Sequence, residues 1–437
     1  MKRILLILIA MGSAALFAQE TKPLTLQECV KIALENNLRV KRGYYNLKTS
    51  EINLTQSKMA MLPSLNAGSS YGKNYGRALN PVDNDFINKN SNTANLQGNS
   101  SVMLFNGLRI RNTINQNASD FNATSKDLEK AKNDVVLSVV NTYTNVVFNK
   151  ELFENATYQL KSSQEQLDRI TKQVVAGSLS LSNQLNQEAQ VATNEVNLIN
   201  QENALNLSLL QLKQAMQMPG STALDVVAPE IELEDLVLSN SPEQIYGIAL
   251  QAMPEIQSAR LRIESSDFAL RAAKGNLYPR LSMNGSAQTN YSNLSPFNFN
   301  DQMNNNLYKT AGLSLTLPIF NGLQSRSAVQ RAAVSKEVAS IVKQETENTL
   351  RQSIETSYND AVAASKTYTA SLKQVKAREE AYRMTKQRFE IGAANYVEFR
   401  ISENDLFQAK SDLARAKYNF IFRKKLLDFY QGKPIEF

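Results

Sequence analysis

The chain has 437 residues, with 48 Lys and Arg against 41 Asp and Glu and a formal net charge of +7. It has no histidine, which excludes His-based triads and most zinc sites, and its one cysteine, Cys29, excludes an internal disulfide. Because the positive charges are spread along the chain and no Gly-rich phosphate loop or carboxylate pair is present, we predict no nucleic-acid partner, catalytic residue, cofactor or metal site.

The N-terminus has the three parts of a secretory signal peptide. Lys2 and Arg3 precede an apolar run from Ile4 to Phe17, and Ala18 follows it. We therefore predict that residues 1–18 are a signal peptide that is removed. The alternative is a retained membrane anchor, but the run is shorter than the ~20 residues that span a bilayer. No later segment has 18 consecutive apolar residues, so membrane insertion is not expected to use a helix.

Matching residues recur along the chain at a nearly constant offset, which indicates an internal duplication. The offset is 216 for Ala33 with Ala249, Leu34 with Leu250, Pro63 with Pro279 and Leu65 with Leu281. It is 215 for Gly107 with Gly322, Arg111 with Arg326, Tyr143 with Tyr358, Gly177 with Gly392 and Glu188 with Glu403. We infer a first repeat at 19–218, an acidic linker at 219–240 and a second repeat at 241–437.

Each repeat contains two segments in which apolar or small residues alternate with polar ones. The first repeat has them at about 64–76 and 94–105, and the second at about 280–291 and 307–320. Alternation over this length is typical of a transmembrane β-strand. Aromatic residues lie near the strand ends, where they are either interfacial girdles or ordinary strand residues; these are Tyr71, Tyr75, Phe105, Tyr278, Tyr291, Tyr308 and Phe320.

Long stretches without Gly or Pro follow each pair of strands and are rich in good helix formers. They predict helices at about 107–176, 178–218, 322–391 and 393–431. The first and third follow Asn-Gly pairs, Asn106 with Gly107 and Asn321 with Gly322, which we interpret as strand-to-helix junctions with Asn as the N-cap. Gly177 and Gly392 separate the helices of each pair and suit a turn with positive φ.

Four strands are too few to close a membrane barrel, which needs about eight or more. An open sheet edge in lipid leaves backbone groups unpaired, so strands in a membrane imply that several chains share one barrel. Two copies reach only the minimum of eight, whereas three copies give twelve strands and twelve helical segments. We therefore expect three copies, although closure alone does not prove that number.

The order of these elements resembles the TolC family of outer-membrane efflux proteins, also called outer membrane factors. The likeness rests on the duplicated unit, the "LFNGL" and "IFNGL" junctions, and the segments "AGSLSLSNQLNQEAQ" and "IGAANYVEFRISENDLFQA" after the turn glycines. It implies a mainly α fold with transmembrane β: a homotrimer, each chain giving one third of a 12-stranded barrel continued by a periplasmic α-helical barrel.

The resemblance also implies a location and a function. The protein is expected in the outer membrane, in contact with its lipid and extending into the periplasm. There it would bind a periplasmic adaptor protein and an inner-membrane pump of the RND or ABC type, in a tripartite efflux or type I secretion system. It is expected to be a passive duct for small molecules, drugs or polypeptides, and not an enzyme.

The family pattern also points to residues at the periplasmic tip. Glu398 lies six residues after Gly392 and matches an aperture acid, whereas Asn183 stands at the corresponding place in the first repeat. Ile401 stands where the family has a second acidic residue, and Ala394 stands where it has the basic partner. The ionic links that usually hold the aperture in this family are therefore not expected here. The alternative for Glu398 is an ordinary solvated helix carboxylate.

Adaptor contact is expected near the tip turns at Gly177 and Gly392, with Ala394 and Arg400 beside the second turn. Arg400 is expected to supply local positive charge or to contact a partner. The alternative is that Arg400 is an ordinary solvated side chain with no special role.

Two other classes of protein also have long helices. A periplasmic adaptor carries a helical hairpin, but it needs lipoyl-like and β-barrel modules instead of this duplicated unit. A secreted coiled-coil protein leaves the four alternating segments unexplained. We therefore keep the adaptor as the alternative function.

Overall fold

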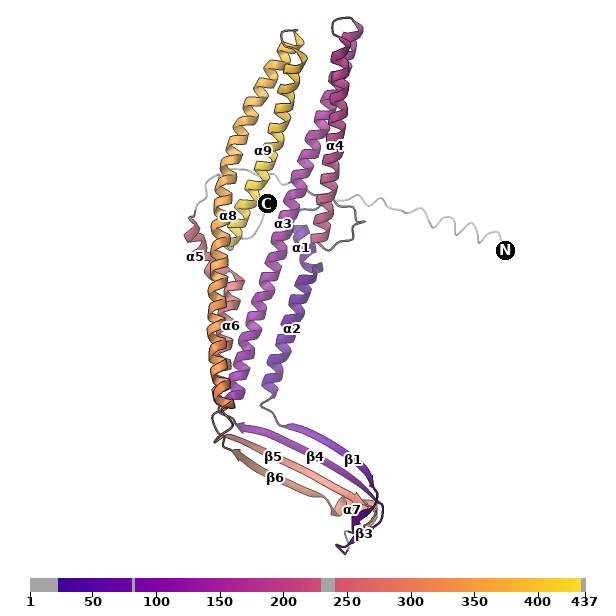
Figure 1. Ribbon diagram of the computed structural model, residues 1–437, viewed down its shortest axis with the longest axis vertical. Coiled ribbons are helices and arrows are strands. Elements are labelled where there is room, and N and C mark those ends of the chain that lie inside the picture. Colours follow the sequence, from indigo (N-terminus) through magenta and orange to yellow (C-terminus); the bar gives the residue numbers. More distant parts are fainter. Residues whose placement is uncertain (1–22, 81–82, 229–239, 434–437) are drawn as a thin grey trace, which may run out of the picture. The chain divides into compact units, whose positions relative to one another are not determined.

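The protein is mostly helical with a small sheet (Figure 1), in a computed structural model that describes residues 23–80, 83–228 and 240–433. The predicted signal peptide lies outside the described residues, and so does the part of the predicted linker at 229–239. The helices are α1 (Leu26–Asn36), α2 (Leu38–Met59), α3 (Arg109–Val175), α4 (Leu181–Ala215), α5 (Pro242–Ala252), α6 (Pro254–Gly275), α7 (Phe299–Asn305), α8 (Gln324–Glu390) and α9 (Tyr396–Tyr430). The strands are β1 (Ser64–Asn74), β2 (Arg77–Leu79), β3 (Phe86–Asn88), β4 (Ser91–Phe105), β5 (Arg280–Ser292) and β6 (Tyr308–Thr316).

Several boundaries differ from those expected from the sequence. Helices α4 and α9 begin three residues later than expected, because the extended residues Ser180 and Asn395 occupy their N-cap positions. Strand β6 ends at Thr316 and not at residue 320, since Pro318 has no N–H to continue the ladder. Helices α1, α2, α5, α6 and α7 and the β2–β3 hairpin were not among the predicted elements.

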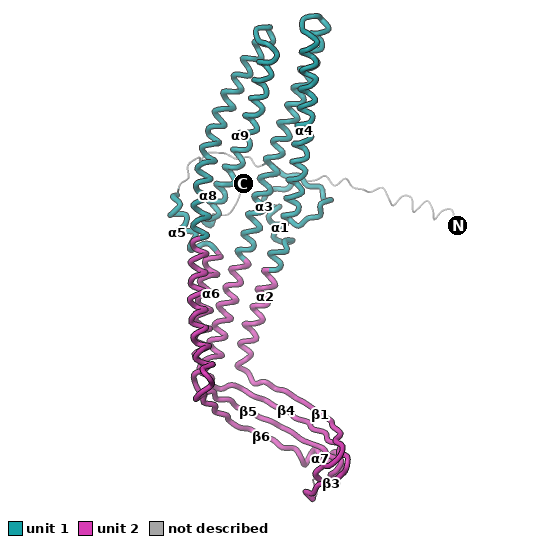
Figure 2. The backbone as a smooth tube through the Cα atoms, viewed as in Figure 1, with its two compact units in different colours: residues 1–42, 129–253, 349–437 teal, residues 43–128, 254–348 magenta. Residues whose placement is uncertain are grey.

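The chain divides into two compact units (Figure 2). Unit 1 comprises residues 1–42, 129–253 and 349–437, and unit 2 comprises residues 43–128 and 254–348. Each unit takes segments from both repeats, so this division cuts across the predicted boundary between 19–218 and 241–437. The duplication is a feature of the sequence, whereas the packing joins corresponding parts of the two copies.

Unit 2 contains a four-stranded antiparallel sheet in the order β1–β4–β5–β6. Strands β1 and β4 come from the first repeat and β5 and β6 from the second, so both repeats build one sheet. One row across it pairs Gly68 with Gln97, Gln97 with Gln288, and Gln288 with Tyr308. Because side chains alternate along a strand, this register places most polar positions of the four strands on one face and most apolar positions on the other.

The two strand-to-helix junctions have the same backbone conformation. Gly107 and Leu108 have φ of +65° and +62°, and Gly322 and Leu323 have φ of +60° and +64°. Glycine adopts this left-handed conformation without strain, whereas for an L-residue such as leucine the conformation costs about 1–2 kcal/mol of folding free energy. The sequence indicated the glycine of each junction but gave no sign that a leucine would share its conformation.

The asparagines of the junctions make only long capping contacts. The N–H of Ile110 donates to Asn106 Oδ1 at 3.4 Å, and the N–H of Ser325 donates to Asn321 Oδ1 at 3.5 Å. The first junction is also packed closely against the end of α6. A Cβ added to Gly275 would lie 2.8 Å from the carbonyl oxygen of Gly107, so both glycines are needed for this backbone approach.

Unit 1 contains α1, α4, α5, α9 and parts of α2, α3 and α8, whose buried side chains form its core. Thr25 begins α1 with a capping box, in which its hydroxyl accepts from the N–H of Glu28 and Glu28 accepts from the N–H of Thr25. Cys29 on α1 is fully buried, and burial raises the pKa of its thiol to about 12. It therefore behaves as a small core residue.

We predict that Gly275→Ala destabilises the protein, by about 1–3 kcal/mol, because the new methyl group meets the Gly107 carbonyl and the Arg109 side chain. The matched control is Gly247→Ala in α5, where an added Cβ meets nothing within 4 Å. In a helix, alanine there should stabilise by up to about 1 kcal/mol. Denaturant unfolding of both variants checks this. A Gly275→Ala protein as stable as the wild type contradicts the close approach.

Candidate functional site

One face of the sheet in unit 2 is polar and almost without charge. Its side chains, shared among the four strands, include Asn66, Ser70, Asn95, Gln97, Asn99, Asn284, Ser286, Gln288, Asn290, Thr310 and Ser314. A hollow of about 420 Å³ lies among several of them, bordered also by Asn306 and Tyr308. Amide and hydroxyl groups bind water and polar solutes without preferring either sign of charge.

The opposite face of the sheet is apolar and open. Leu65 is 82% exposed and Leu313 is 68% exposed, and the same face also carries the exposed side chains of Tyr71, Leu96, Met283 and Leu315. A contiguous apolar surface of this kind marks contact with another protein or with lipid. Among the described helices, none has a stretch long and apolar enough to cross a membrane.

The sheet also has two unpaired edges within the described chain. Strand β1 pairs only with β4, and β6 pairs only with β5. Each outer edge therefore presents backbone N–H and C=O groups that another strand can pair with.

The two helical hairpins of unit 1 turn at the predicted glycines. Gly177 has φ of +75° and Gly392 has φ of +76°. The N–H of Ser178 donates to the carbonyl of Gln173, and the N–H of Ala393 donates to that of Arg388, so both helices end in the same type of C-cap. The shared bonding explains why both turns need a glycine.

The second hairpin carries an ion pair at its turn. Arg388 near the end of α8 contacts Glu398 in the first turn of α9, with Nη1 2.7 Å from Oε1. The side chain of Asn395 caps α9 by accepting from the N–H of Glu398 at 2.8 Å. An acid at this position is also favoured by the helix dipole alone, so capping gives Glu398 a structural role whatever else it does.

The first hairpin has no counterpart of this ion pair. The positions equivalent to Arg388 and Glu398 are Gln173 and Asn183, which are uncharged. Ser180 occupies the N-cap of α4, but its side chain makes no capping bond. The structure therefore places the predicted residues Asn183 and Glu398 at equivalent turns with different electrostatics.

The other predicted tip residues lie around the second turn. Ile401 is exposed on α9, Ala394 is half-buried in the turn, and the guanidinium of Arg400 lies 6.0 Å from the centre of the Tyr396 ring. Exposed apolar side chains flank both turns: Val175 and Leu181 at the first, and Ile391 and Val397 at the second. Both turns thus present apolar surface.

A buried polar contact joins the two hairpins and was not predicted from the sequence. Tyr396 on α9 donates a short hydrogen bond from its hydroxyl to the side-chain oxygen of Gln187 on α4. The amide nitrogen of Gln187 in turn donates to the carbonyl of Ser163 on α3 at 2.8 Å. Phe389 and Phe399 stack beside this contact with ring centres 4.9 Å apart. The tip of unit 1 is therefore held by a satisfied polar contact within an apolar cluster.

Further along α9, Glu403 is a buried carboxyl group with only 6% of its surface exposed. Ser162 on α3 donates to its Oε1 at 3.2 Å. Burial raises the pKa of Glu403, although Ser162 and the positive charges of Lys386, Arg400 and Arg169 oppose that shift. Among the described residues, no group of three or more Cys, Asp or Glu side chains is arranged to hold a metal ion.

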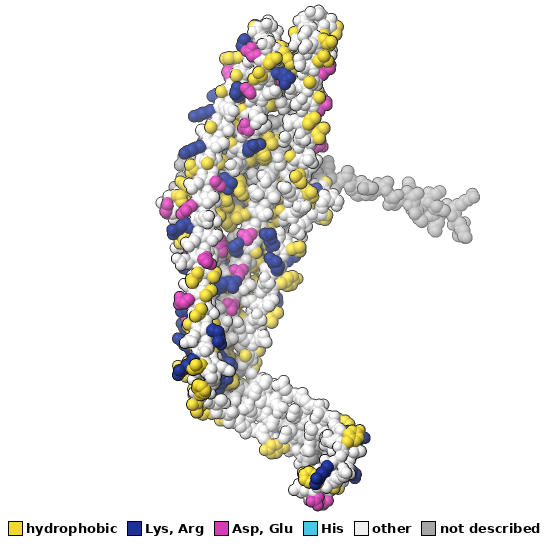
Figure 3. Space-filling model, in the orientation of Figure 1, with side chains coloured by type: hydrophobic (Ala, Val, Ile, Leu, Met, Phe, Trp, Pro, Cys, Tyr) yellow, Lys and Arg dark blue, Asp and Glu magenta, His cyan; other side chains and the backbone are white. Residues whose placement is uncertain are grey.

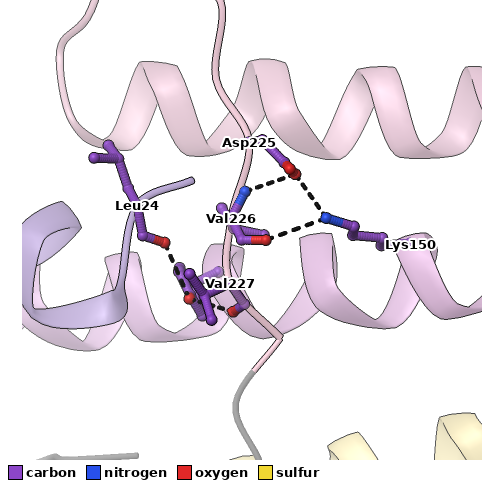
Figure 4. Close-up of polar contacts among 6 residues, drawn as sticks. Leu24, Lys150, Asp225, Val226 and Val227 are labelled. Atoms are coloured by element: carbon purple, nitrogen blue, oxygen red, sulfur yellow. Dashed lines mark hydrogen bonds and ion pairs between the residues drawn. The ribbon is translucent and has the colours of Figure 1, made fainter. Parts of the chain in front are cut away.

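A second polar contact holds the N-terminal segment and the start of the linker on α3 (Figure 4). Leu24 forms a parallel bridge with Val226, and the hydroxyl of Tyr143 donates to the carbonyl of Val227 at 2.6 Å. Lys150 binds the carboxylate of Asp225 at 2.8 Å. Burial is the main cause of the raised pKa of Tyr143. The predicted linker is thus anchored where it begins.

These features define a chain in which one unit carries strands with one apolar and one polar face, and the other unit carries two long helical hairpins. The sequence matches the family described as "Outer membrane efflux protein" over residues 29–216 and 245–425. The chain therefore belongs to the outer membrane efflux protein family, as the resemblance predicted.

The relatives of the chain span nearly its full length. Outer membrane protein TolC of Escherichia coli (strain K12) is 22% identical over 435 residues, covering 97% of this chain and 85% of TolC. Outer membrane efflux protein BepC of Brucella suis biovar 1 (strain 1330) is 22% identical, covering 94% of this chain and 86% of BepC.

Solved structures share the fold. The outer membrane protein VceC of Vibrio cholerae superposes with a TM-score of 0.78 at 15% identity, covering 94% of this chain and 97% of VceC. The structure of CusC superposes with a TM-score of 0.80 at 15% identity, covering 94% of this chain and 92% of that chain. The CusC structure is described in terms of transmembrane channel formation. The family and the relatives do not support the adaptor alternative.

We predict that Glu403→Gln stabilises the protein near pH 8, because it removes the cost of burying a charged carboxylate. The folded-state pKa lies above the ordinary value of 4.5, so the wild type loses stability as the pH rises through that raised pKa. Below pH 4.5 the difference in stability between the two proteins should be smallest, because Glu403 is then uncharged in both the folded and the unfolded state.

Thermal melting across this pH range, in one detergent, measures the difference. The matched control is Glu188→Gln, because Glu188 is the equivalent position of the first repeat and is exposed. A Glu403→Gln gain that does not change with pH, or an equal gain in the control, contradicts the assignment.

Proposed function

We propose that this protein is the outer-membrane duct of a tripartite efflux or type I secretion system. Three copies would each give four strands to a twelve-stranded barrel, which long helices continue into the periplasm. The observation that carries the proposal is the sheet of unit 2, with one largely apolar exposed face, one nearly uncharged polar face and two unpaired edges. Lipid would cover the apolar face and water would fill the space on the polar one.

Membership of the outer membrane efflux protein family supports an assembly with other proteins, and so do the exposed apolar side chains at the two hairpin turns. The apolar side chains around Gly177 and Gly392, with Ala394 and Arg400, are the surface that we propose for a periplasmic adaptor. The adaptor would connect the duct to an inner-membrane pump of the RND or ABC type. Among the relatives, one carries the name of a toluene efflux pump protein and another that of a protease secretion protein. Shared family membership therefore does not define the cargo.

At the periplasmic end we propose that Glu398 lies at an aperture, with Asn183 and Ile401 as its neutral neighbours. The pairing of Glu398 with Arg388 supports an aperture whose net charge is small, since each carboxylate has a guanidinium at 2.7 Å. An exposed pair of this kind contributes little stability, so its removal should alter the local field more than the fold.

We predict that Leu313→Arg strongly reduces insertion into the outer membrane, because an arginine facing lipid costs about 2–4 kcal/mol at the membrane midplane. The matched control is Ser314→Arg, one residue further along β6, whose side chain lies on the polar face. Fractionation of cell membranes and heat-modified electrophoresis measure insertion. Equal effects of the two substitutions, or a soluble wild-type protein, contradict the proposal.

For the aperture we predict opposite effects of its two charged residues. Glu398→Ala should lower the cation selectivity of single channels and Arg388→Ala should raise it, because each substitution leaves the other charge unpaired beside the pore. The reversal potential in a salt gradient measures the selectivity, and both effects should weaken as salt rises. If neither substitution shifts the reversal potential, Glu398 does not line the aperture.

A further inference from the structure

The four segments that connect helices and strands in unit 2 carry only positive charge. Residues 52–65, 102–119, 268–285 and 313–336 contain nine Lys and Arg residues and no Asp or Glu. Over the whole chain the two kinds are nearly balanced, at 48 against 41. Figure 3 shows the Lys and Arg side chains gathered over the helices of unit 2 where they adjoin the sheet. Chain-wide composition does not account for this separation of charge.

Five of the nine side chains form what we call the basic collar. They are Lys58 at the end of α2, Arg111 at the start of α3, Lys274 at the end of α6, and Arg326 and Arg331 at the start of α8. All five are exposed, and none makes an ion pair with another residue that the structure describes. By contrast, Asp267 binds both Arg271 and Lys336 at 2.7 Å. The collar charges therefore lack a protein counter-charge.

The collar is present in both repeats. Lys58 corresponds to Lys274 at the offset of 216, and Arg111 corresponds to Arg326 at the offset of 215. These residues come from the ends of four different helices, so they form a band and not a pocket. A band of separate charges suits an extended anionic surface better than one small ligand.

Apolar side chains accompany the collar at the same connections. Ile319 is 93% exposed and Phe320 is 82% exposed just before α8, and Leu62 and Tyr278 are exposed after α2 and α6. Exposed apolar residues followed by long basic side chains are typical of the boundary between hydrocarbon and lipid headgroups. The order along the chain is thus apolar strand, apolar junction and basic helix end.

We propose that the basic collar binds the phosphate groups of anionic phospholipids in the leaflet that faces the helices. The inference rests on the proposed function, because it requires the sheet to lie in a membrane. Lys and Arg attract an anionic membrane surface through charge, and the attraction falls with salt. The collar therefore fixes the depth of the sheet as well as selecting the lipid around it.

The test uses the full-length protein reconstituted into vesicles with equal amounts of phosphatidylcholine and phosphatidylglycerol. Discs are cut from these vesicles with an amphipathic polymer, and the lipid retained with the protein is compared with the bulk. We expect phosphatidylglycerol to be enriched at least about twofold at low salt, and the enrichment to fall as salt is added.

The substitutions Lys58→Gln, Arg111→Gln, Lys274→Gln and Arg326→Gln, combined, remove four of the five collar charges and should strongly reduce the enrichment. The matched control replaces four exposed lysines of unit 1 with Gln: Lys161, Lys366, Lys373 and Lys376. This control should keep the enrichment, although it removes the same charge.

Inserted wild-type protein without phosphatidylglycerol enrichment overturns the inference and leaves the proposed function intact. So does a collar variant that retains the enrichment, or one that changes only the ion selectivity of the channel, which would place the collar in the lumen. Failure of the wild type to insert into any vesicle overturns the proposed function itself. If the collar variant does not fold, the wild type alone tests the inference. Phosphatidylglycerol enrichment that does not fall as salt is added then overturns it.

Discussion

The rest of the structure depends on how the backbone groups at the edges of the sheet are satisfied. Strands β1 and β6 each have one neighbour in the described chain, so their outer N–H and C=O groups have no ladder partner. Water can satisfy such groups, but in hydrocarbon each one costs several kcal/mol. The exposed leucines of the apolar face, in contrast, are more stable in hydrocarbon than in water. Both demands are met when the edges pair with other copies of the chain, which is why we propose an assembly.

The two repeats are similar in backbone but have diverged where side chains matter. Arg388 and Glu398 form an ion pair at the second hairpin, whereas Gln173 and Asn183 stand at the first. Glu403 is buried, whereas its equivalent, Glu188, is exposed. In a closed assembly, hairpins of the two kinds would alternate. A partner that docks at the tip would therefore meet two different surfaces, one ionic and one neutral.

Much of the fold was predictable from the sequence because its signals are local. Alternation of apolar and polar residues indicated β1, β4, β5 and β6, and the runs without Gly or Pro correspond to the long helices. Gly177 and Gly392 indicated turns with positive φ, and both have it. Periodicity sufficed here because a strand with one face in lipid must alternate and a long helix cannot hold proline.

What the sequence did not predict depends on contacts between distant residues. Gln187 is a polar residue buried by packing between hairpins, and Tyr396 satisfies it from more than two hundred positions away. The pairing of Arg388 with Glu398 depends on how the turn folds back. Helices α1, α2, α5 and α6 were not predicted, although α1 and α5 have a more distinct apolar face than the long helices. The long helices were predicted from runs free of Gly and Pro, whereas Gly43, Gly247 and Pro254 lie within three of these four shorter helices. These residues become interpretable only when the packing is known.

The most direct test of the account is whether β6 of one chain lies beside β1 of another. In a protein with Cys29→Ala, each variant would carry one cysteine on the outer edge of β1 and one on the outer edge of β6. Each such pair would be tested by oxidation in membranes. If three chains share one barrel, matched pairs should join the chains into a covalently linked trimer. Disulfides that form only within single chains, or links that stop at dimers for every pair, would contradict the shared barrel.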